Sequence, residues 1–196
     1  MLIYQVVQKS VNNFLFPGED WMGVSLDEFM SCPSNLANNR QTRMLADLRL
    51  VNCYNTSGID SRDRDRTMLD SAKQNLLDMA FFGLTELQLE SQYMFERAFD
   101  MTFKLKFFQY DHDHASKAQQ SLGKVTLDRI RELNALDIEL YEFAHRVMLQ
   151  RLEESRSSDP EFDAKLRLIS ERNEPEKDEE EEGELDEDDV AETVSE

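Results

Sequence analysis

The run MAFFGL, residues 79–84, is short, apolar and continuous, the pattern of a strand buried on both faces. Residues 61–78 before it place apolar side chains at helical spacing, and Thr85 after it is a candidate cap for a second helix. A helix, a buried strand and another helix in succession predict a parallel α/β sheet. The first helical stripe consists of Met68, Leu69, Ala72, Leu76 and Leu77, and the second of Leu87, Met94, Phe95 and Ala98.

The segments farther out predict a mainly helical chain. Ser25 and Glu28 have the S-x-x-E spacing of a capping box, so a short helix begins there and ends at Cys32-Pro33. A second helix follows from Ser34, and the longest one covers 126–152. Phe103 to Tyr110 is a second candidate strand.

Composition favours one domain with tails. The chain has 196 residues and a formal net charge of -19, of which roughly -13 lies in residues 173–196. Such an acidic, apolar-poor stretch cannot bury enough surface to fold, so we expect a disordered tail that repels nucleic acid. No apolar stretch reaches the length of a membrane-spanning helix, and any targeting element is expected upstream of Met1.

Several chemistries lack their residues in this sequence. The spacing of Asp60, Asp63 and Asp65 resembles a calcium loop, but the required Gly and Glu are missing. The run from Asp111 to His114 is interpreted as a polar loop, because no distant Cys or His pair completes a metal site. No Walker-type phosphate loop and no nucleophilic triad signature is present. The residues alone therefore predict half an α/β domain without catalytic machinery and without a metal.

Two cysteines and one tripeptide bear on the compartment. Asn55-Thr56-Ser57 is an acceptor sequence for an N-linked glycan in a polar loop. Cys32 and Cys53 are either two buried thiols or a disulfide that closes the intervening helix. Together these features favour a lumenal protein.

The chain contains five ordered blocks between about Gly18 and Leu152: SLDEFMSCPSNLANNRQTRMLADL, NCYN, SAKQNLLDMAFFGLTE, QYMFERAFDMTFK and LNALDIELYEFA. Together these blocks resemble the heparan sulfate 6-O-sulfotransferase family. The resemblance implies a partial parallel-sheet sulfotransferase domain, P-loop NTPase-like, with 79–84 and 103–110 as inner strands. The expected regions are 1–16, without counterpart; 17–152, the C-terminal half of that domain; and 153–196, the acidic tail.

Members of this family transfer a sulfuryl group from 3'-phosphoadenosine 5'-phosphosulfate to the 6-hydroxyl of glucosamine in heparan sulfate, as Golgi type II membrane proteins. An anionic group then moves in line between two oxygens, which resembles phosphoryl transfer. The family's phosphosulfate loop, its catalytic His and its 3'-phosphate ligands lie upstream of the matched region. The resemblance therefore implies that this chain alone is inactive. The alternative is a diverged, non-catalytic helical module that binds a partner.

The family's donor segment has the pattern F-x-Q-[YF]-N-x-T-R-A, and part of it recurs in this chain. Phe108, Gln109, Tyr110 and Ala115 match it, and Phe107 matches its leading Phe. Asp111 replaces the Asn and His114 replaces the Arg, so a permanently charged fork is lost. The resemblance implies that Phe108, Gln109, Tyr110, His114 and Ala115 contact the donor. For Phe107 and Phe108, a place in the strand core is the equal alternative.

Arg40 and Arg43 lie on the polar side of the helix that follows Ser34. Because a guanidinium matches sulfate and carboxylate geometry, both are candidates to bind the sulfated polysaccharide. A solvated helix face with local ion pairs is the equal alternative.

Overall fold

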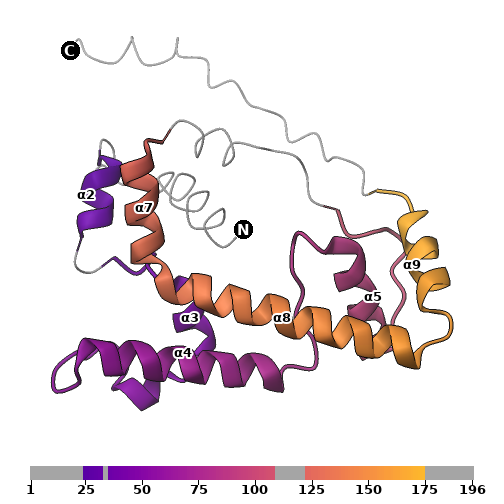
Figure 1. The fold of residues 1–196 in the computed structure, drawn as a ribbon, viewed down its shortest axis with the longest axis horizontal. Coiled ribbons are helices and arrows are strands. Elements are labelled where there is room, and N and C mark those ends of the chain that lie inside the picture. Colours follow the sequence, from indigo (N-terminus) through magenta and orange to yellow (C-terminus); the bar gives the residue numbers. More distant parts are fainter. Residues whose placement is uncertain (1–23, 33–34, 109–121, 175–196) are drawn as a thin grey trace, which may run out of the picture.

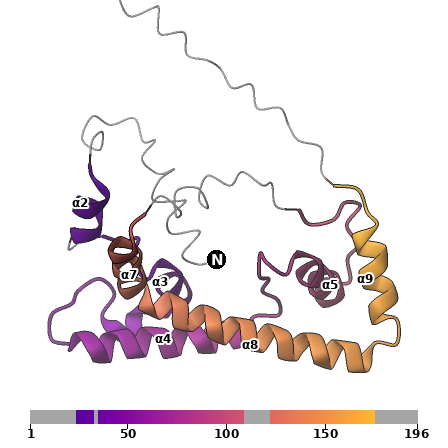
Figure 2. The ribbon, with the colours of Figure 1, turned by 45° about the horizontal axis from the view of Figure 1, so that its top comes forward.

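The structure, a computed structural model, describes residues 24–32, 35–108 and 122–174, and these are mainly helical. The longest helix, α8, extends along the molecule in Figure 1, with α4 beside its first half and α5 and α9 near its end. The turned view in Figure 2 shows the same arrangement. The elements are α2 (Leu26–Ser31), α3 (Arg40–Leu45), the 3-10 helix η2 (Leu48–Val51), α4 (Ser61–Asp78), α5 (Gln88–Phe99), α7 (Lys124–Leu133), α8 (Ala135–Ser158) and α9 (Phe162–Ser170).

The main core lies under one face of α8. Leu140, Ala144, Met148 and Leu152 recur every fourth residue, and all four are buried. They meet buried side chains of α4, α5 and α9. A smaller cluster joins Met30 of α2 to Ile130 of α7. The other buried members of the main core are Leu69, Ala72, Leu76, Leu84, Tyr93, Phe162 and Ile169.

Neither expected strand forms among the described residues, so the predicted sheet is wrong for 79–84 and 103–108. Both segments are non-helical, and side chains of α5 bind backbone groups that a neighbouring strand would otherwise pair. The Ser91 hydroxyl accepts from the Leu84 amide at 3.0 Å and donates to the Leu84 carbonyl at 3.1 Å. Gln92 binds the backbone of Leu105 and Phe107. The expectation that 79–84 is buried on both faces is also wrong, because only Leu84 is buried, and both segments satisfy part of their backbone here without a β-ladder.

Arg151 of α8 binds the junction between α4 and the MAFFGL segment. Its guanidinium donates to the Leu77 carbonyl at 2.8 Å and to the Met79 carbonyl at 3.3 Å. It also lies over the Phe82 ring, 5.1 Å from the centroid. These contacts fix the point where α4 ends and the chain turns toward α5.

Several helix boundaries differ from the predicted ones. The Ser25–Glu28 capping box and α4 over 61–78 are confirmed. Thr85 does not cap α5, which begins at Gln88, and its buried hydroxyl has no hydrogen-bond partner among the described residues. The expected helix over 126–152 is two helices that meet at Asn134.

Residues 153–174 do not belong to a disordered tail, since α8 continues to Ser158 and α9 follows it. Phe162 and Ile169 of α9 are 4% and 2% exposed, so this helix is part of the core. The apolar spacing of Phe162, Leu166 and Ile169 was the sequence signal for this helix.

Candidate functional site

Residues 103–108 lead into the family's donor pattern, which begins at Phe107, and they lie between α5 and residues 172–174. The Lys106 amide donates to the Asn173 carbonyl at 3.1 Å, and its ammonium pairs with Glu174 at 2.9 Å. Gln109, Tyr110, Asp111, His114 and Ala115 lie outside the described residues.

Phe107 belongs to an aromatic cluster on α5. Its ring centroid lies 5.1 Å from that of Phe103 and 6.3 Å from that of Phe95. Phe81 and Phe99 also stack on Phe95, at 5.0 Å and 4.7 Å. This packing favours the core alternative for Phe107. Phe108, the next residue, is 36% exposed.

Arg40 and Arg43 lie in α3, whose first turn is capped by a side chain of α8. The Asp137 carboxyl accepts from the Gln41 amide at 3.0 Å and from the Thr42 amide and hydroxyl, each at 2.7 Å. Asp137 and Thr42 are completely buried. The position of both arginines therefore depends on a residue about ninety-five positions later in the chain.

A reciprocal cap fixes the start of α8. The Asn39 side-chain oxygen accepts from the amides of Leu136 and Asp137 at 3.0 and 3.3 Å. The Asn134 side-chain oxygen accepts from the Asn39 amide at 3.1 Å. Asn39 has φ of +50°, a left-handed conformation that asparagine tolerates better than most residues. The helices α3 and α8 thus satisfy each other's free amides.

Arg43 is half-buried, and this desolvation is the largest cause that lowers the pKa of its guanidinium. The nearby Asp137 opposes the shift, whereas the positive charges of Arg40 and Arg64 add to it. Arg43 also donates to the Leu36 carbonyl. Arg43 is therefore partly engaged in holding its own loop, in addition to facing solvent.

Arg64 is a further positive residue of this region that the sequence did not single out. It donates to the carbonyls of Val51 and Cys53, which end η2. With Arg40 and Arg43 it gathers three positive charges around α3, η2 and the start of α4. Its place in the alternating run RDRDR concealed it, because such a run usually forms a solvated helix face.

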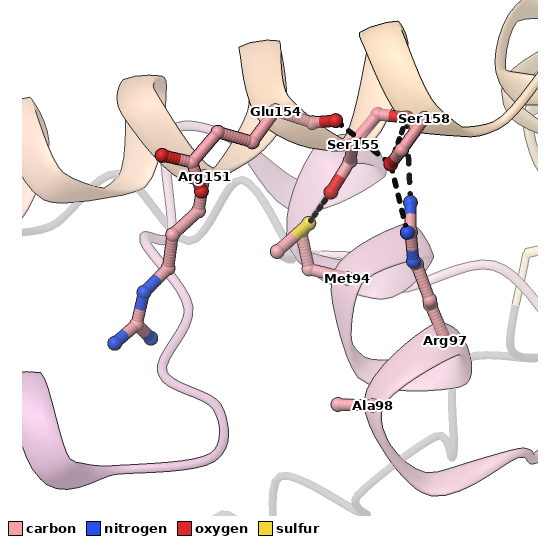
Figure 3. Close-up of a pocket in the computed structure, with 7 residues that line it drawn as sticks. All are labelled: Met94, Arg97, Ala98, Arg151, Glu154, Ser155 and Ser158. Atoms are coloured by element: carbon pink, nitrogen blue, oxygen red, sulfur yellow. Dashed lines mark hydrogen bonds between the residues drawn. The ribbon is translucent and has the colours of Figure 1, made fainter.

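An open depression of about 400 Å³ lies between α5 and α8 (Figure 3). Arg97 spans it, donating to the Ser158 hydroxyl at 3.0 Å and to the Ser155 carbonyl at 3.3 Å. The Ser155 hydroxyl in turn contacts the Met94 sulfur at 3.4 Å. These polar groups join the two helices, which favours a structural role for the depression. It is lined by Met94, Arg97, Ala98, Arg151, Glu154, Ser155 and Ser158.

Asp159, the residue after the end of α8, accepts three hydrogen bonds. Its carboxyl accepts from the Lys165 ammonium at 2.9 Å, the Tyr93 hydroxyl at 2.8 Å and the Glu161 amide at 3.0 Å. The Lys165 hydrogen bond, followed by that of Tyr93, lowers the pKa of Asp159 to about 2.

This shift predicts a contribution to acid stability. Because the pKa is lower in the folded state, Asp159 stabilises the protein above its usual pKa of 3.8, and this stabilisation disappears as the pH falls toward 2. Chemical denaturation of the wild type and of Asp159→Asn at several pH values should show a constant difference in unfolding free energy above about pH 5 that shrinks below it. A pH-independent difference down to pH 2 would contradict the prediction.

The glycan acceptor loop is exposed throughout Asn52 to Gly58. The Asn55 side-chain oxygen accepts from the Ser57 amide at 2.9 Å, which forms a turn on the surface. The Asn55 side chain is therefore in a loop that a modifying enzyme can reach.

The expected Cys32–Cys53 disulfide is not formed, and both residues are exposed free thiols. Cys32 ends α2, which packs on α7 through the Met30–Ile130 cluster. Cys53 follows η2, where its amide donates to the Leu48 carbonyl at 2.7 Å and its carbonyl accepts from Arg64. Each cysteine is thus held by a different local unit.

Within residues 24–32, 35–108 and 122–174, no group of three or more His, Cys, Asp or Glu side chains is placed to hold a metal ion. Asp60 of the calcium-like run instead caps α4, accepting from the Arg62 amide at 2.9 Å. Among the helices of these residues, none is both long and apolar enough to cross a bilayer.

Comparison with known proteins places the chain in a family. Residues 3–144 match the model of the family described as "Sulfotransferase family". The chain therefore belongs to the sulfotransferase family. The match includes most of segment 1–16, for which no counterpart was expected.

Among its relatives, heparan-sulfate 6-O-sulfotransferase 2 of Gallus gallus is 51% identical over 144 residues, covering 74% of this chain and 35% of the relative. The protein of the same name from Danio rerio is 50% identical over 157 residues, or 80% and 33% of the two chains. Heparan-sulfate 6-O-sulfotransferase 1 of Homo sapiens is 50% identical over 141 residues, or 72% and 34%. The resemblance stated from the motifs is thus confirmed.

This chain spans about a third of the length of these relatives. The family match includes both segments that were expected to be strands. The family assignment rests on this sequence match. It therefore stands although neither segment forms a strand among the described residues.

Proposed function

We propose that this chain is the C-terminal part of a heparan sulfate 6-O-sulfotransferase. The observation that supports this is an identity of 50–51% over 141–157 residues to three proteins that carry that name. The donor is 3'-phosphoadenosine 5'-phosphosulfate, the acceptor is the 6-hydroxyl of glucosamine in heparan sulfate, and no metal takes part.

The chain's own share of this reaction is to bind and orient. Phe108 is a partly exposed residue at the start of the donor segment, and the adjacent Phe107 anchors that segment on α5. Arg40, Arg43 and Arg64 supply positive charge for a sulfated, carboxylated polymer. Holding both reactants in line lowers the barrier by reducing the entropy lost on reaction.

The test is a chimera in which this chain replaces the matching third of the Danio rerio relative. We expect the chimera to transfer radiolabelled sulfate to desulfated heparan sulfate, and disaccharide analysis to locate the label at the 6-hydroxyl of glucosamine. The unaltered relative is the positive control. A folded chimera that transfers no sulfate would favour the alternative, a non-catalytic helical module that binds a partner. Asp111 and His114 are the residues that favour this alternative, because they replace the Asn and the Arg of the family's donor pattern.

The 196-residue chain by itself should bind the donor product poorly. Isothermal titration calorimetry with 3'-phosphoadenosine 5'-phosphate is expected to give a dissociation constant no tighter than roughly millimolar, because most of the family's phosphate-binding groups lie upstream of the matched region. Micromolar binding would show that the donor site lies largely within this chain.

We also propose that the protein works in the Golgi lumen, anchored through a part of the protein outside this chain. The exposed Asn55-Thr56-Ser57 loop supports this, since glycans are added to such loops in the secretory pathway.

If the chain is secreted from cultured cells behind a cleavable leader, Asn55 is expected to carry an N-linked glycan. Peptide mass spectrometry after glycosidase treatment should then detect aspartate at residue 55. Ser57→Ala should abolish the modification, and Ser57→Thr should preserve it. An unmodified Asn55 in secreted wild-type protein would remove the support that this loop gives to a lumenal location.

A further inference from the structure

The backbone of the donor segment is held by one buried side-chain amide. Gln92 of α5 is completely buried. Its oxygen accepts from the Phe107 amide at 2.6 Å, and its nitrogen donates to the Leu105 carbonyl at 3.0 Å. Since the side-chain amide donates and accepts on alternate residues of an extended segment, it imitates one rung of a β-ladder.

Glu96, one helical turn later, extends this contact. Its carboxylate accepts from the Gln92 side chain at 3.0 Å and from the Phe103 amide at 3.1 Å. The Glu96 side chain is only 12% exposed. Burial alone raises the pKa of this carboxyl, but hydrogen bonds from Arg172, Phe103 and Gln92 lower it overall, so the group is held as an anion.

The cation that balances Glu96 comes from the far end of the chain. Arg172 donates through two nitrogens to the two carboxylate oxygens, the second contact measuring 3.2 Å, which is a bidentate fork. Its side chain is 18% exposed. The following residues, Asn173 and Glu174, bind the backbone and side chain of Lys106. The segment 172–174 thus covers the donor segment on the side opposite α5.

Helix α9 determines where this covering segment lies. The Phe162 ring packs edge-on against Tyr93 of α5, with centroids 4.7 Å apart, and Ile169 is 2% exposed in the core. Both α9 and Arg172 lie beyond residue 144, where the family match ends. The contact is therefore made by a part of the chain that lies outside the family match.

We propose that Gln92, Glu96 and Arg172 are positioning residues that hold the donor segment in register, so that Phe107 stays anchored and Phe108 is presented to the donor. This inference rests on the proposed function, because it takes 103–108 as the start of the donor-binding segment. It assigns a role in donor binding to residues that touch neither donor nor acceptor.

The first experiment uses the 196-residue chain. Amide hydrogen exchange measured by NMR should show Phe103 and Phe107 protected in the wild type. Arg172→Ala should speed their exchange by about tenfold or more, because it leaves a buried carboxylate without its cation. Arg172→Lys should be intermediate, since it keeps the charge and loses the fork. Arg167→Ala removes an exposed arginine from α9 and should leave both rates unchanged.

The second experiment introduces the same variants into the active chimera. Arg172→Ala should raise the KM for the donor by about tenfold and leave the KM for the polysaccharide unchanged, with Arg172→Lys between. Arg167→Ala should match the parent in both constants. Gln92→Leu should change the donor KM in the same direction; if it fails to fold, the Arg172 variants still decide the question.

Each outcome has one meaning. Unchanged exchange at Phe103 and Phe107 in Arg172→Ala would overturn the contact itself. Faster exchange with an unchanged donor KM would overturn the positioning role and leave a purely structural one. An inactive parent chimera would overturn the proposed function, and the donor role with it, whatever the exchange rates show. Faster exchange together with a selective rise in the donor KM supports the proposal.

Discussion

Asp137→Ala is expected to lower the free energy of unfolding by about 3 to 5 kcal/mol, because it removes a buried carboxyl that accepts three hydrogen bonds. The amides of Gln41 and Thr42 and the Thr42 hydroxyl would lose their acceptor at the first turn of α3. Asp137→Asn should cost less, since one oxygen remains to accept. Urea denaturation followed by circular dichroism at 222 nm measures the change.

Glu139→Ala, two residues further along α8, is the matched control. Glu139 is 57% exposed and pairs with Lys73 at 2.6 Å, so its removal should cost about 0.5 kcal/mol or less. Equal losses for the two variants would mean that the capping of α3 by Asp137 contributes little. The same turn carries Arg40 and Arg43, the residues proposed to bind the polysaccharide.

Met148→Ala is expected to cost about 2 to 5 kcal/mol, the range for removing a large buried side chain from a packed core. Met148 is 1% exposed, on the face of α8 that meets the main core. The loss has two sources. Folding removes less apolar surface from water, and the neighbouring side chains do not fill the cavity that the methionine side chain leaves.

Its control is the next residue along the helix. Leu149 is 47% exposed, so Leu149→Ala removes a similar volume from the surface and should cost about 1 kcal/mol or less. Urea midpoints for both variants, compared at equal m-values, measure the difference. If Leu149→Ala proved the more damaging change, the orientation of α8 in the core would be wrong.

Periodicity predicted the helices that are stabilised by their own apolar stripe. The helix over 61–78 was found within its expected bounds because Met68, Leu69, Ala72 and Leu76 all face the core. The break at Asn134 was not predictable from local pattern, because it depends on hydrogen bonds with Asn39, about ninety-five residues away. Apolar spacing continues across the break and therefore hides it.

The strands were expected because apolar extended runs usually satisfy their backbone in a sheet. In this chain Ser91 and Gln92 supply such bonds from a helix, and nothing in their local sequence distinguishes them from ordinary polar helix residues. The sequence did not single out Gln92, Glu96 and Arg172 for the same reason: their partners are set by the fold and not by the local sequence. Arg172 lies next to the acidic run, and only the fold brings it to Glu96.

Helix α8 also fixes the distance between two parts of the molecule. Near its start, Asp137 accepts hydrogen bonds from the first turn of α3, which carries Arg40 and Arg43. Near its end, Ser155 and Asp159 contact α5, whose Gln92 binds the backbone of residues 105 and 107. Its 24 residues correspond to about 36 Å of rigid rod. One inserted residue between these points would lengthen the rod by about 1.5 Å and rotate its far end by about 100°. The distance between the turn that carries Arg40 and Arg43 and the end of α8 that contacts α5 thus depends on the number of residues in one helix.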